Sequence, residues 1–214
     1  MSTPAQPSPL EPRWLSIARE VQALAQVGLA FTADGFNQQR YTRLRELAAL
    51  MLAQDAADYE PILNLLRQEK GYATPKVDVR GAAFAEGRIL MVREVSDGKW
   101  TLPGGWADVN QSAGECVARE IDEESGFKAR PVKLAAVYDY QRSGHPSHHI
   151  DSIYKMFFIC EIFGGAACTS DETSEVAFFA RGALPPLSLG RTTAAQIDRM
   201  FHHREHPELA TDFD

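Results

Sequence analysis

The sequence predicts an α/β or α+β sandwich preceded by a small all-α domain, and three observations lead to this prediction. Apolar residues repeat at helical spacing from Arg13 to about Gly71. After Gly71-Tyr-Ala-Thr-Pro75 the pattern changes to short strand-like runs. Only two helical patterns, near 112–125 and 192–203, interrupt those runs. Strands that bracket two helices are typical of a sandwich.

The helical part divides into three segments. A turn-like Thr32-Ala-Asp-Gly35 separates the first two, so we expect a helical hairpin followed by a short third helix. The apolar stripes favour packing or dimerisation, and direct contact with substrate is the alternative. The three stripes are Trp14, Ile17, Ala18, Val21, Leu24 and Ala25; Leu44, Leu47, Ala48, Met51 and Leu52; and Ile62, Leu63, Leu65 and Leu66.

We expect three parts along the chain: a disordered leader at 1–12, a helical N-terminal domain at 13–71 and the sandwich domain at 72–214. The leader is rich in proline and lacks the apolar core of a secretory signal. A hairpin turn is expected at Glu86-Gly87. The expected strands are 77–84, 89–92, 133–140, 153–162 and 176–180.

The composition excludes several classes of protein. Acidic residues number 29 against 22 Lys and Arg, and the formal charge of −7 opposes the coating of a polyanion, so we expect no nucleic-acid partner. No apolar stretch approaches the roughly 20 residues of a membrane span. Cys116, Cys160 and Cys168 lack metal-ligand spacing and cannot all pair, so we expect reduced, buried thiols in a cytoplasmic protein.

The negative charge is concentrated in one segment. Residues 105–127 carry six acidic residues and one arginine, and so hold five of the seven net charges. Ser112 and Glu115 have the spacing of a capping box, and Gly126 is placed to end the helix that follows. At about 100° per residue, three carboxylates share one face of that helix. They are Glu120, Glu123 and Glu124.

This carboxylate face predicts a cation site. Like charges at this spacing destabilise a bare helix by a few tenths of a kcal/mol per pair, and the helix dipole disfavours anions near the C-terminus. A bound divalent cation reverses both costs, and oxygen ligands without His or Cys favour Mg²⁺ or Mn²⁺ over Zn²⁺. A solvated acidic face is the alternative, which the adjoining glycine loop and the lone Arg119 make weaker.

At these residues the sequence resembles the Nudix hydrolases, whose signature is G-x5-E-x7-R-E-U-x-E-E-x-G-U, where U is a bulky aliphatic residue. From Gly105 to Phe127 the spacing of the signature holds throughout. Phe127 replaces the usual aliphatic residue, and Gln111 replaces the first glutamate. In the family that glutamate mainly pairs with the arginine of the signature. Gln111 can still accept a hydrogen bond from Arg119, without the charge-assisted component.

The resemblance implies a Nudix α/β/α sandwich with a mixed sheet and a Mg²⁺ cofactor. Glu120 and Glu124 would be the principal ligands of the ion, with Glu123 a third ligand or the water-activating group. Arg119 would orient Glu120. Gly104 and Gly105 would let the loop backbone approach the substrate closely.

Residues outside the signature are candidates for the base and for binding substrate. The base is expected from Asp171-Glu172-Thr-Ser-Glu175, where Glu172 and Glu175 are otherwise solvated loop carboxylates. The loop Gln141–His149 holds His145, His148 and His149, which contact substrate, bind a transition metal or form an ordinary polar loop. Tyr138, Tyr140 or Trp106 could stack on a base or sugar, whereas Trp100 is expected in the core. Arg80, Arg93 and Arg142 are candidate phosphate contacts, with surface solvation as the alternative.

The helical N-terminal segments and the entry strand also resemble the bacterial Nudix subgroup with a helical N-terminal extension. That resemblance implies a homodimer and hydrolysis of ADP-ribose or CDP-choline, giving a nucleoside monophosphate and the phosphorylated other half. The alternatives are a non-catalytic Nudix-fold nucleotide sensor or interaction module, and an RNA-directed Nudix hydrolase. No basic track supports RNA as the substrate.

Overall fold

The computed structural model describes residues 12–53, 55–146 and 149–214, and within them it holds five helices and seven strands. The described chain divides into two compact units, 12–75 with 149–152 and 76–146 with 153–214. Most of the leader expected at 1–12 lies outside the described residues. The segment 149–152, which the sequence placed in the sandwich domain, belongs to the helical unit.

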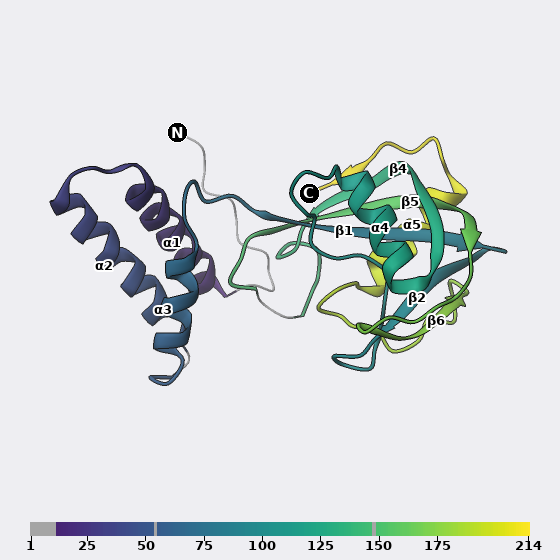
Figure 1. The fold of residues 1–214 in the computed structure, drawn as a ribbon, viewed down its shortest axis with the longest axis horizontal. Coiled ribbons are helices and arrows are strands. Elements are labelled where there is room, and N and C mark those ends of the chain that lie inside the picture. Colours follow the sequence, from purple (N-terminus) through teal and green to yellow (C-terminus); the bar gives the residue numbers. More distant parts are fainter. Residues whose placement is uncertain (1–11, 54, 147–148) are drawn as a thin grey trace. The chain divides into compact units, whose positions relative to one another are not determined.

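The helical unit is the expected hairpin with a third helix, drawn in purple and blue in Figure 1. It consists of α1 (Arg13–Phe31), α2 (Gly35–Leu52) and α3 (Tyr59–Gln68). The Asp34 side chain accepts the backbone N–H groups of Phe36 and Asn37, which begins α2. Seven buried residues form the core of the unit: Leu15, Ala18, Ala48, Ala49, Leu52, Leu63 and Leu66.

The predicted apolar stripe of α1 is only partly the buried face. Ala18 and Ala25 are buried, but Trp14, Ile17 and Leu24 keep 45%, 41% and 60% of their surface exposed. The buried face is centred instead on the side of the helix that carries Leu15 and Gln22. The unit therefore leaves a row of large apolar side chains uncovered.

The second unit is built on a mixed sheet in the order β3-β2-β1-β5-β4-β7, with β6 paired to β2. The β1–β5 and β4–β7 pairs are parallel, and the others are antiparallel. The strands are β1 (Lys76–Ala85), β2 (Arg88–Glu94), β3 (Trp100–Thr101), β4 (Phe127–Asp139), β5 (Ile153–Gly165), β6 (Thr173–Phe179) and β7 (Asp212–Phe213). The sequence did not predict the two-residue strands β3 and β7, and it began β6 three residues late.

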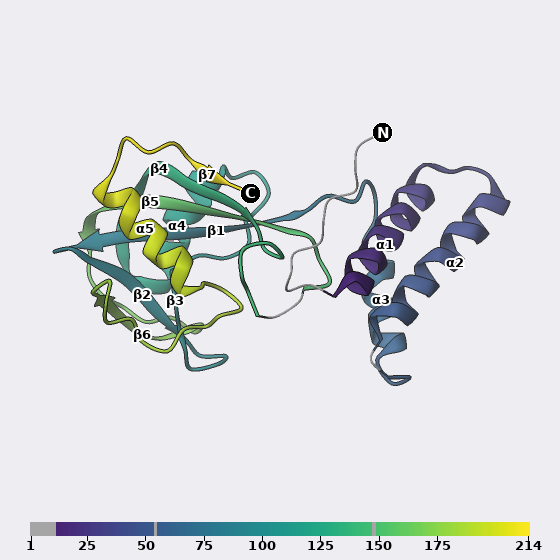
Figure 2. The same cartoon turned by 180° about the vertical axis from the view of Figure 1, so that it is seen from behind.

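One helix covers each face of this sheet. α4 (Ala113–Ser125) lies in front of the strands in Figure 1, and α5 (Ala194–Glu205) lies in front of them in the reverse view of Figure 2. Alternate residues of the strands face the two helices, so two separate apolar clusters form. Leu90 packs with α4, and its neighbours Ile89 and Met91 pack with α5. This confirms the predicted α/β/α sandwich.

Two local predictions in this unit also hold. Glu86 and Gly87 have φ angles of 50° and 73°, so the β1–β2 hairpin closes on two left-handed residues. Trp100 is buried and packs edge-on against Phe179 with ring centroids 4.8 Å apart. In the described part of the chain, no helix has the length and apolar character needed to cross a membrane.

Candidate active site

The acidic helix α4 begins and ends as its sequence predicts. The Ser112 side chain accepts the N–H of Glu115, and the Glu115 carboxylate accepts the N–H of Ser112, which completes the capping box. Gly126 ends the helix at φ 74°. The apolar face, with Val117 and Ile121 fully buried, packs on the sheet and leaves the carboxylates at its margin.

The loop after β3 is fixed against β1 by backbone hydrogen bonds. The N–H groups of Gly81 and Val79 donate to the carbonyls of Pro103 and Gly105, at 2.9 and 2.8 Å. Gly104 has a φ of 140°, and a Cβ atom there would lie 2.0 Å from the Val79 carbonyl oxygen. Only glycine can therefore occupy position 104 in this arrangement.

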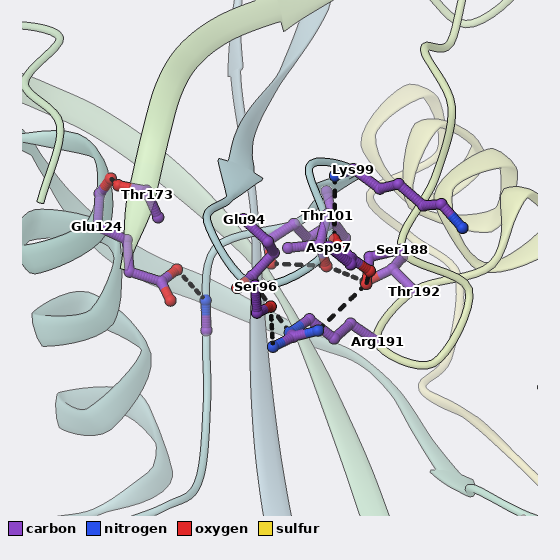
Figure 3. A network of polar contacts seen from close by, with 12 residues as sticks. Glu94, Ser96, Asp97, Lys99, Thr101, Glu124, Thr173, Ser188, Arg191 and Thr192 are labelled. Atoms are coloured by element: carbon purple, nitrogen blue, oxygen red, sulfur yellow. Dashed lines mark hydrogen bonds and ion pairs between the residues drawn. The ribbon is translucent and has the colours of Figure 1, made fainter. Parts of the chain in front are cut away.

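Glu124 is the most deeply buried carboxylate of the helix, at 6% exposure. Its Oε2 accepts the Gly104 N–H at 2.8 Å, and its backbone carbonyl accepts the Thr173 hydroxyl at 2.7 Å (Figure 3). Burial raises the pKa of Glu124 to about 8, and the charge of Glu120 adds to the rise, although Arg80 and the Gly104 N–H oppose it. The acidic helix and the glycine loop are thus joined through this side chain.

Glu120 lies one turn before Glu124, against the same loop. Its Oε2 is 3.2 Å from the position that a Cβ atom on Gly105 would take, so glycine leaves room for the carboxylate. Burial also raises the pKa of Glu120, against the attraction of Arg119. The structure therefore brings the predicted residues Glu120, Glu124, Gly104 and Gly105 together.

Arg119 is held by several groups at once. Its Nε donates to the Gln111 Oε1 at 3.2 Å, as the sequence predicts. Its Nη2 lies 2.8 Å from the Asp108 Oδ2 and 2.9 Å from the Glu120 Oε1. Asp108 supplies a carboxylate where the signature glutamate is missing. The sequence prediction overlooked Asp108 because its place in the glycine loop lies outside the fixed positions of the signature.

Glu123 is placed differently from the other two carboxylates. Its Oε2 lies 2.6 Å from the Arg119 Nη1, and 58% of its side chain is exposed. Arg119 thus holds Glu123 through one carboxylate oxygen, as it also holds Glu120.

The chemistry of the Glu120–Glu124 pair fits a divalent cation. Both carboxylates lose solvation by burial, and the charge of Glu120 further disfavours ionisation of Glu124. A cation between such groups removes the repulsion and replaces the lost water. The donors are oxygens, which suits Mg²⁺ or Mn²⁺.

The strands β1 and β5 carry a buried group of charges that the sequence did not predict. Arg80 donates from Nε and Nη2 to the two carboxylate oxygens of Asp78, at 3.0 and 2.7 Å. The Lys155 Nζ lies 2.6 Å from Asp78 Oδ1. Although burial opposes it, the two cations hold the pKa of Asp78 below its usual range. Burial and the neighbouring Arg80 lower the pKa of Lys155 to about 8.

The alternative offered for Arg80, a solvated surface residue, is wrong. Arg80 is 4% exposed, because its guanidinium is bound by Asp78 and by the Leu102 carbonyl, to which Nη1 donates at 3.2 Å. The contact with Leu102 ties Arg80 to the start of the glycine loop. A sequence signal was available, since Asp78 and Arg80 are two residues apart and so share one face of β1.

A second polar network lies at the end of β2 (Figure 3). Glu94 is 6% exposed, and its Oε1 lies 2.9 Å from the Arg191 Nε. Arg191 also donates to the hydroxyls of Ser188 and Ser96, at 3.2 and 3.3 Å. Burial raises the pKa of Glu94, and the charge of Glu172 contributes to the rise. Glu94 is thus a further buried carboxylate that the sequence did not single out.

The two candidate bases differ in their surroundings. Glu175 lies within β6 rather than in a loop, and it pairs with Arg93. Arg93 also donates to the Gly98 carbonyl at 2.7 Å. Glu172 lies in the loop before β6, and its backbone carbonyl accepts the Val95 N–H at 2.9 Å.

The histidine loop places its residues in different settings. His145 is 4% exposed and stacks on Tyr140 with ring centroids 4.2 Å apart. Its Nδ1 is 2.7 Å from the Leu189 carbonyl, and its Nε2 is 3.1 Å from the Gln196 amide nitrogen. His145 is therefore neither a solvated loop residue nor free to bind a metal. His149 is exposed, and His148 lies outside the described residues.

The aromatic candidates and Arg142 also differ in how far they are exposed. Tyr140 is 2% exposed, so its ring faces His145 rather than an open site. Tyr138 donates its hydroxyl to Asp212 at 3.1 Å. Trp106, in the glycine loop, is 47% exposed, and Arg142 is exposed.

Fold and site together define a Nudix hydrolase: a carboxylate-lined helix seated against a glycine loop, on one face of a mixed sheet. The family profile described as NUDIX domain matches residues 74–201, and the chain belongs to this family. A second profile, described as UDP-X-like, N-terminal oligomerisation domain, matches residues 12–66. The chain is accordingly a Nudix pyrophosphohydrolase with an N-terminal oligomerisation domain.

Relatives match over most of their length. The protein YjhB of Bacillus subtilis (strain 168), provisionally named an ADP-ribose pyrophosphatase, is 43% identical over 206 residues, which is 96% of this chain and 99% of that protein. A crystal structure of a UDP-X diphosphatase covers 94% of this chain and 98% of its own, with 32% identity and a TM-score of 0.61. An ADP-ribose pyrophosphatase from Streptococcus suis 89-1591 covers 66% of this chain and all of its own, with 37% identity and a TM-score of 0.61.

Proposed function

We propose that the protein hydrolyses the pyrophosphate bond of a nucleoside diphosphate derivative in a Mg²⁺-dependent reaction. ADP-ribose is the first candidate, with CDP-choline and UDP-linked compounds of the same class next. The products would be a nucleoside monophosphate and the phosphorylated other half. The observation that carries the proposal is the convergence of Glu120 and Glu124 on the Gly104–Gly105 loop.

In this proposal Glu120 and Glu124 hold the metal ion, and Mn²⁺ could replace Mg²⁺. When bound, the ion supplies neutralisation of phosphate charge. Glu123, whose Oε2 pairs with Arg119, is a third ligand or activates the water. Arg119 positions Glu120 through the ion pair between them.

For the base we favour Glu172 over Glu175. Glu175 is already paired with Arg93. Glu172 lies close enough to the buried carboxylate Glu94 for its charge to raise the pKa of that group. The glycine loop offers backbone to the phosphates, and the exposed Trp106 and Arg142 are the side chains free to contact the rest of the substrate. Arg80 acts on substrate only through the loop, by its bond to Leu102. Tyr140 is buried, and its ring stacks on His145.

A substrate panel tests the proposal. The full chain would be incubated with Mg²⁺ and ADP-ribose, CDP-choline, a UDP-sugar or a capped RNA, beside the variant Glu124→Gln. We expect turnover of at least one nucleoside diphosphate derivative and its loss in the variant. Turnover of the capped RNA alone would favour the RNA-directed alternative. Equal activity in Glu124→Gln would refute the site.

We also propose a homodimer formed through the helical unit, in the cytoplasm. Large apolar side chains on α1 and α2 remain exposed in the single chain, among them Leu24, Phe31 and Phe36 at 60%, 72% and 73%. All three cysteines are free, and Cys168 is exposed rather than buried as expected, which suits a reducing compartment. Light scattering of the full chain and of Leu24→Asp tests the dimer. Unchanged mass in the variant would exclude this surface.

A further inference from the structure

The last turn of α5 and the C-cap residue after it carry three side chains of metal-ligating types. His202 and Glu205 lie three residues apart on the same side of α5, and His206 is the C-cap residue that follows, with a non-helical φ of −127°. One nitrogen of each ring and one carboxylate oxygen lie within 4.8 Å of one another. The two imidazole rings have centroids 4.6 Å apart.

Charges of both signs surround these side chains. The group lies at the C-terminal end of α5, where the helix dipole is negative. Two further carboxylates adjoin it: Asp198, whose charge interacts with His202, and Glu208, which contacts His206. Arg181 binds two of the carboxylates here, Asp198 and Glu205, while the charges of Arg199 and Lys133 act on Asp198 and Glu208.

The neighbours also orient the ligands. The His206 Nδ1 lies 3.3 Å from the Glu208 Oε1, which leaves the other ring nitrogen for a metal. Arg181 donates from Nη1 to the Glu205 Oε2 at 3.0 Å and binds Asp198 with Nε and Nη2. A carboxylate behind a ligating histidine is the usual outer contact of a protein metal site. The oxygen Oε1 of Glu205 remains for an ion.

We propose that His202, Glu205 and His206 bind a transition-metal ion of the Zn²⁺ type, with the fourth position open to water. Two imidazoles and one carboxylate suit Zn²⁺, whereas Mg²⁺ prefers oxygen alone. Zinc–ligand bonds of about 2.0–2.1 Å require ligand atoms about 3.3 Å apart. Rotation of the exposed Glu205 and His206 side chains supplies the remaining movement.

This site is separate from the carboxylates of α4. The two helices cover opposite faces of the sheet, as Figures 1 and 2 show, and their buried residues belong to different apolar clusters. The two sites also differ in ligand chemistry. Each can therefore be removed without touching the other.

Calorimetric titration of the full chain with Zn²⁺, free of any histidine tag and in excess Mg²⁺, tests the proposal. We expect one Zn²⁺ bound per chain, and a loss of at least about tenfold in affinity in His202→Ala/His206→Ala. The matched controls Glu124→Gln and His149→Ala should bind as the unaltered chain does. Hydrolysis with Mg²⁺ should be unchanged in the double variant.

Two further measurements separate loss of the metal ligands from misfolding and identify the ligating atoms. Glu205→Gln retains the shape of the side chain and should also weaken binding of Zn²⁺, which guards against misfolding of the double variant. Cu²⁺ bound in place of Zn²⁺ should show nitrogen coupling in its electron paramagnetic resonance spectrum. Equal binding of Zn²⁺ in both altered proteins, or a Cu²⁺ spectrum without nitrogen coupling, would overturn the proposal.

Discussion

Asp108 is the residue we expect to carry the charge that the missing signature glutamate would supply. Its Oδ2 lies 2.8 Å from the Arg119 Nη2, while Gln111 offers the Nε of Arg119 a neutral oxygen at 3.2 Å. In Asp108→Asn the guanidinium keeps Glu120 and Glu123 as its charged partners. We expect Arg119 then to compete more strongly with the metal for Glu120.

The exposure of the two side chains sets the size of the effect. Asp108 is 64% exposed and Arg119 is 28% exposed, so the pair is worth at most about 1 kcal/mol. That corresponds to about a fivefold fall in kcat/KM. The concentration of Mg²⁺ needed for half-maximal rate should rise as well, because Glu120 is held back from the ion.

Steady-state kinetics at several Mg²⁺ concentrations would measure both effects. Gln111→Glu alone should change the rate modestly, by less than about tenfold, and should restore Asp108→Asn to within about twofold of the unaltered enzyme. Asp122→Asn is the matched control, because it removes a carboxylate of α4 that pairs with Lys128 instead. Unchanged kinetics in Asp108→Asn, or no rescue by Gln111→Glu, would refute the reasoning.

Three further predictions concern burial and backbone strain. Glu124→Gln removes the charge of a proposed metal ligand, so turnover should fall by about a hundredfold or more. The new side chain keeps an oxygen that can accept the Gly104 N–H, so the thermal stability of the metal-free protein should be kept or rise, and a drop in melting temperature would contradict this. Gly104→Ala places a Cβ atom 2.0 Å from a backbone oxygen and should cost several kcal/mol by chemical denaturation, whereas Gly87→Ala, at φ 73° in open space, should cost about 1 kcal/mol. Burial lowers the pKa of His145 from 6.5 to about 4 in the folded protein. As the pH falls, His145 is therefore protonated in the unfolded chain before it is protonated in the folded one, and the folded state loses stability between pH 6.5 and pH 4. The free energy of unfolding should fall by about 2 kcal/mol from pH 7 to pH 5. This fall should be smaller in His145→Gln and unchanged in the control His149→Gln. If the dependence of stability on pH is the same in His145→Gln as in the unaltered protein, another group is responsible for it.

The main elements of the fold could be predicted because their signals are local. The capping box of Ser112 and Glu115, the terminal Gly126 and the hairpin Glu86-Gly87 each depend on residues at most three apart. The face of α1 was harder to assign. Ala18 is buried in the core, whereas Trp14 and Ile17 remain exposed. Which side of α1 is buried depends on where α2 and α3 pack against it.

The order and pairing of the strands lay beyond local signals. Periodicity located β1 and β5 but not their parallel contact, which joins Asp78 to Lys155 across 77 residues of sequence. Glu94 and Arg191 are also far apart in the sequence, so their ion pair could not be predicted from local patterns either. Arg80 was named as a candidate phosphate contact, and only the folded sheet shows that its charge is used inside the protein.

The sequence by itself determined the acidic helix, the glycine loop and the carboxylates Glu120 and Glu124, since helical spacing fixes which side chains share a face. Only the tertiary structure decided which charges these carboxylates meet. It turned Glu123 toward Arg119, supplied Asp108 where Gln111 lacks a charge, and seated Glu124 on the loop. The physical reason is that burial and charge pairing depend on distances across the folded chain, which spacing along the sequence does not encode.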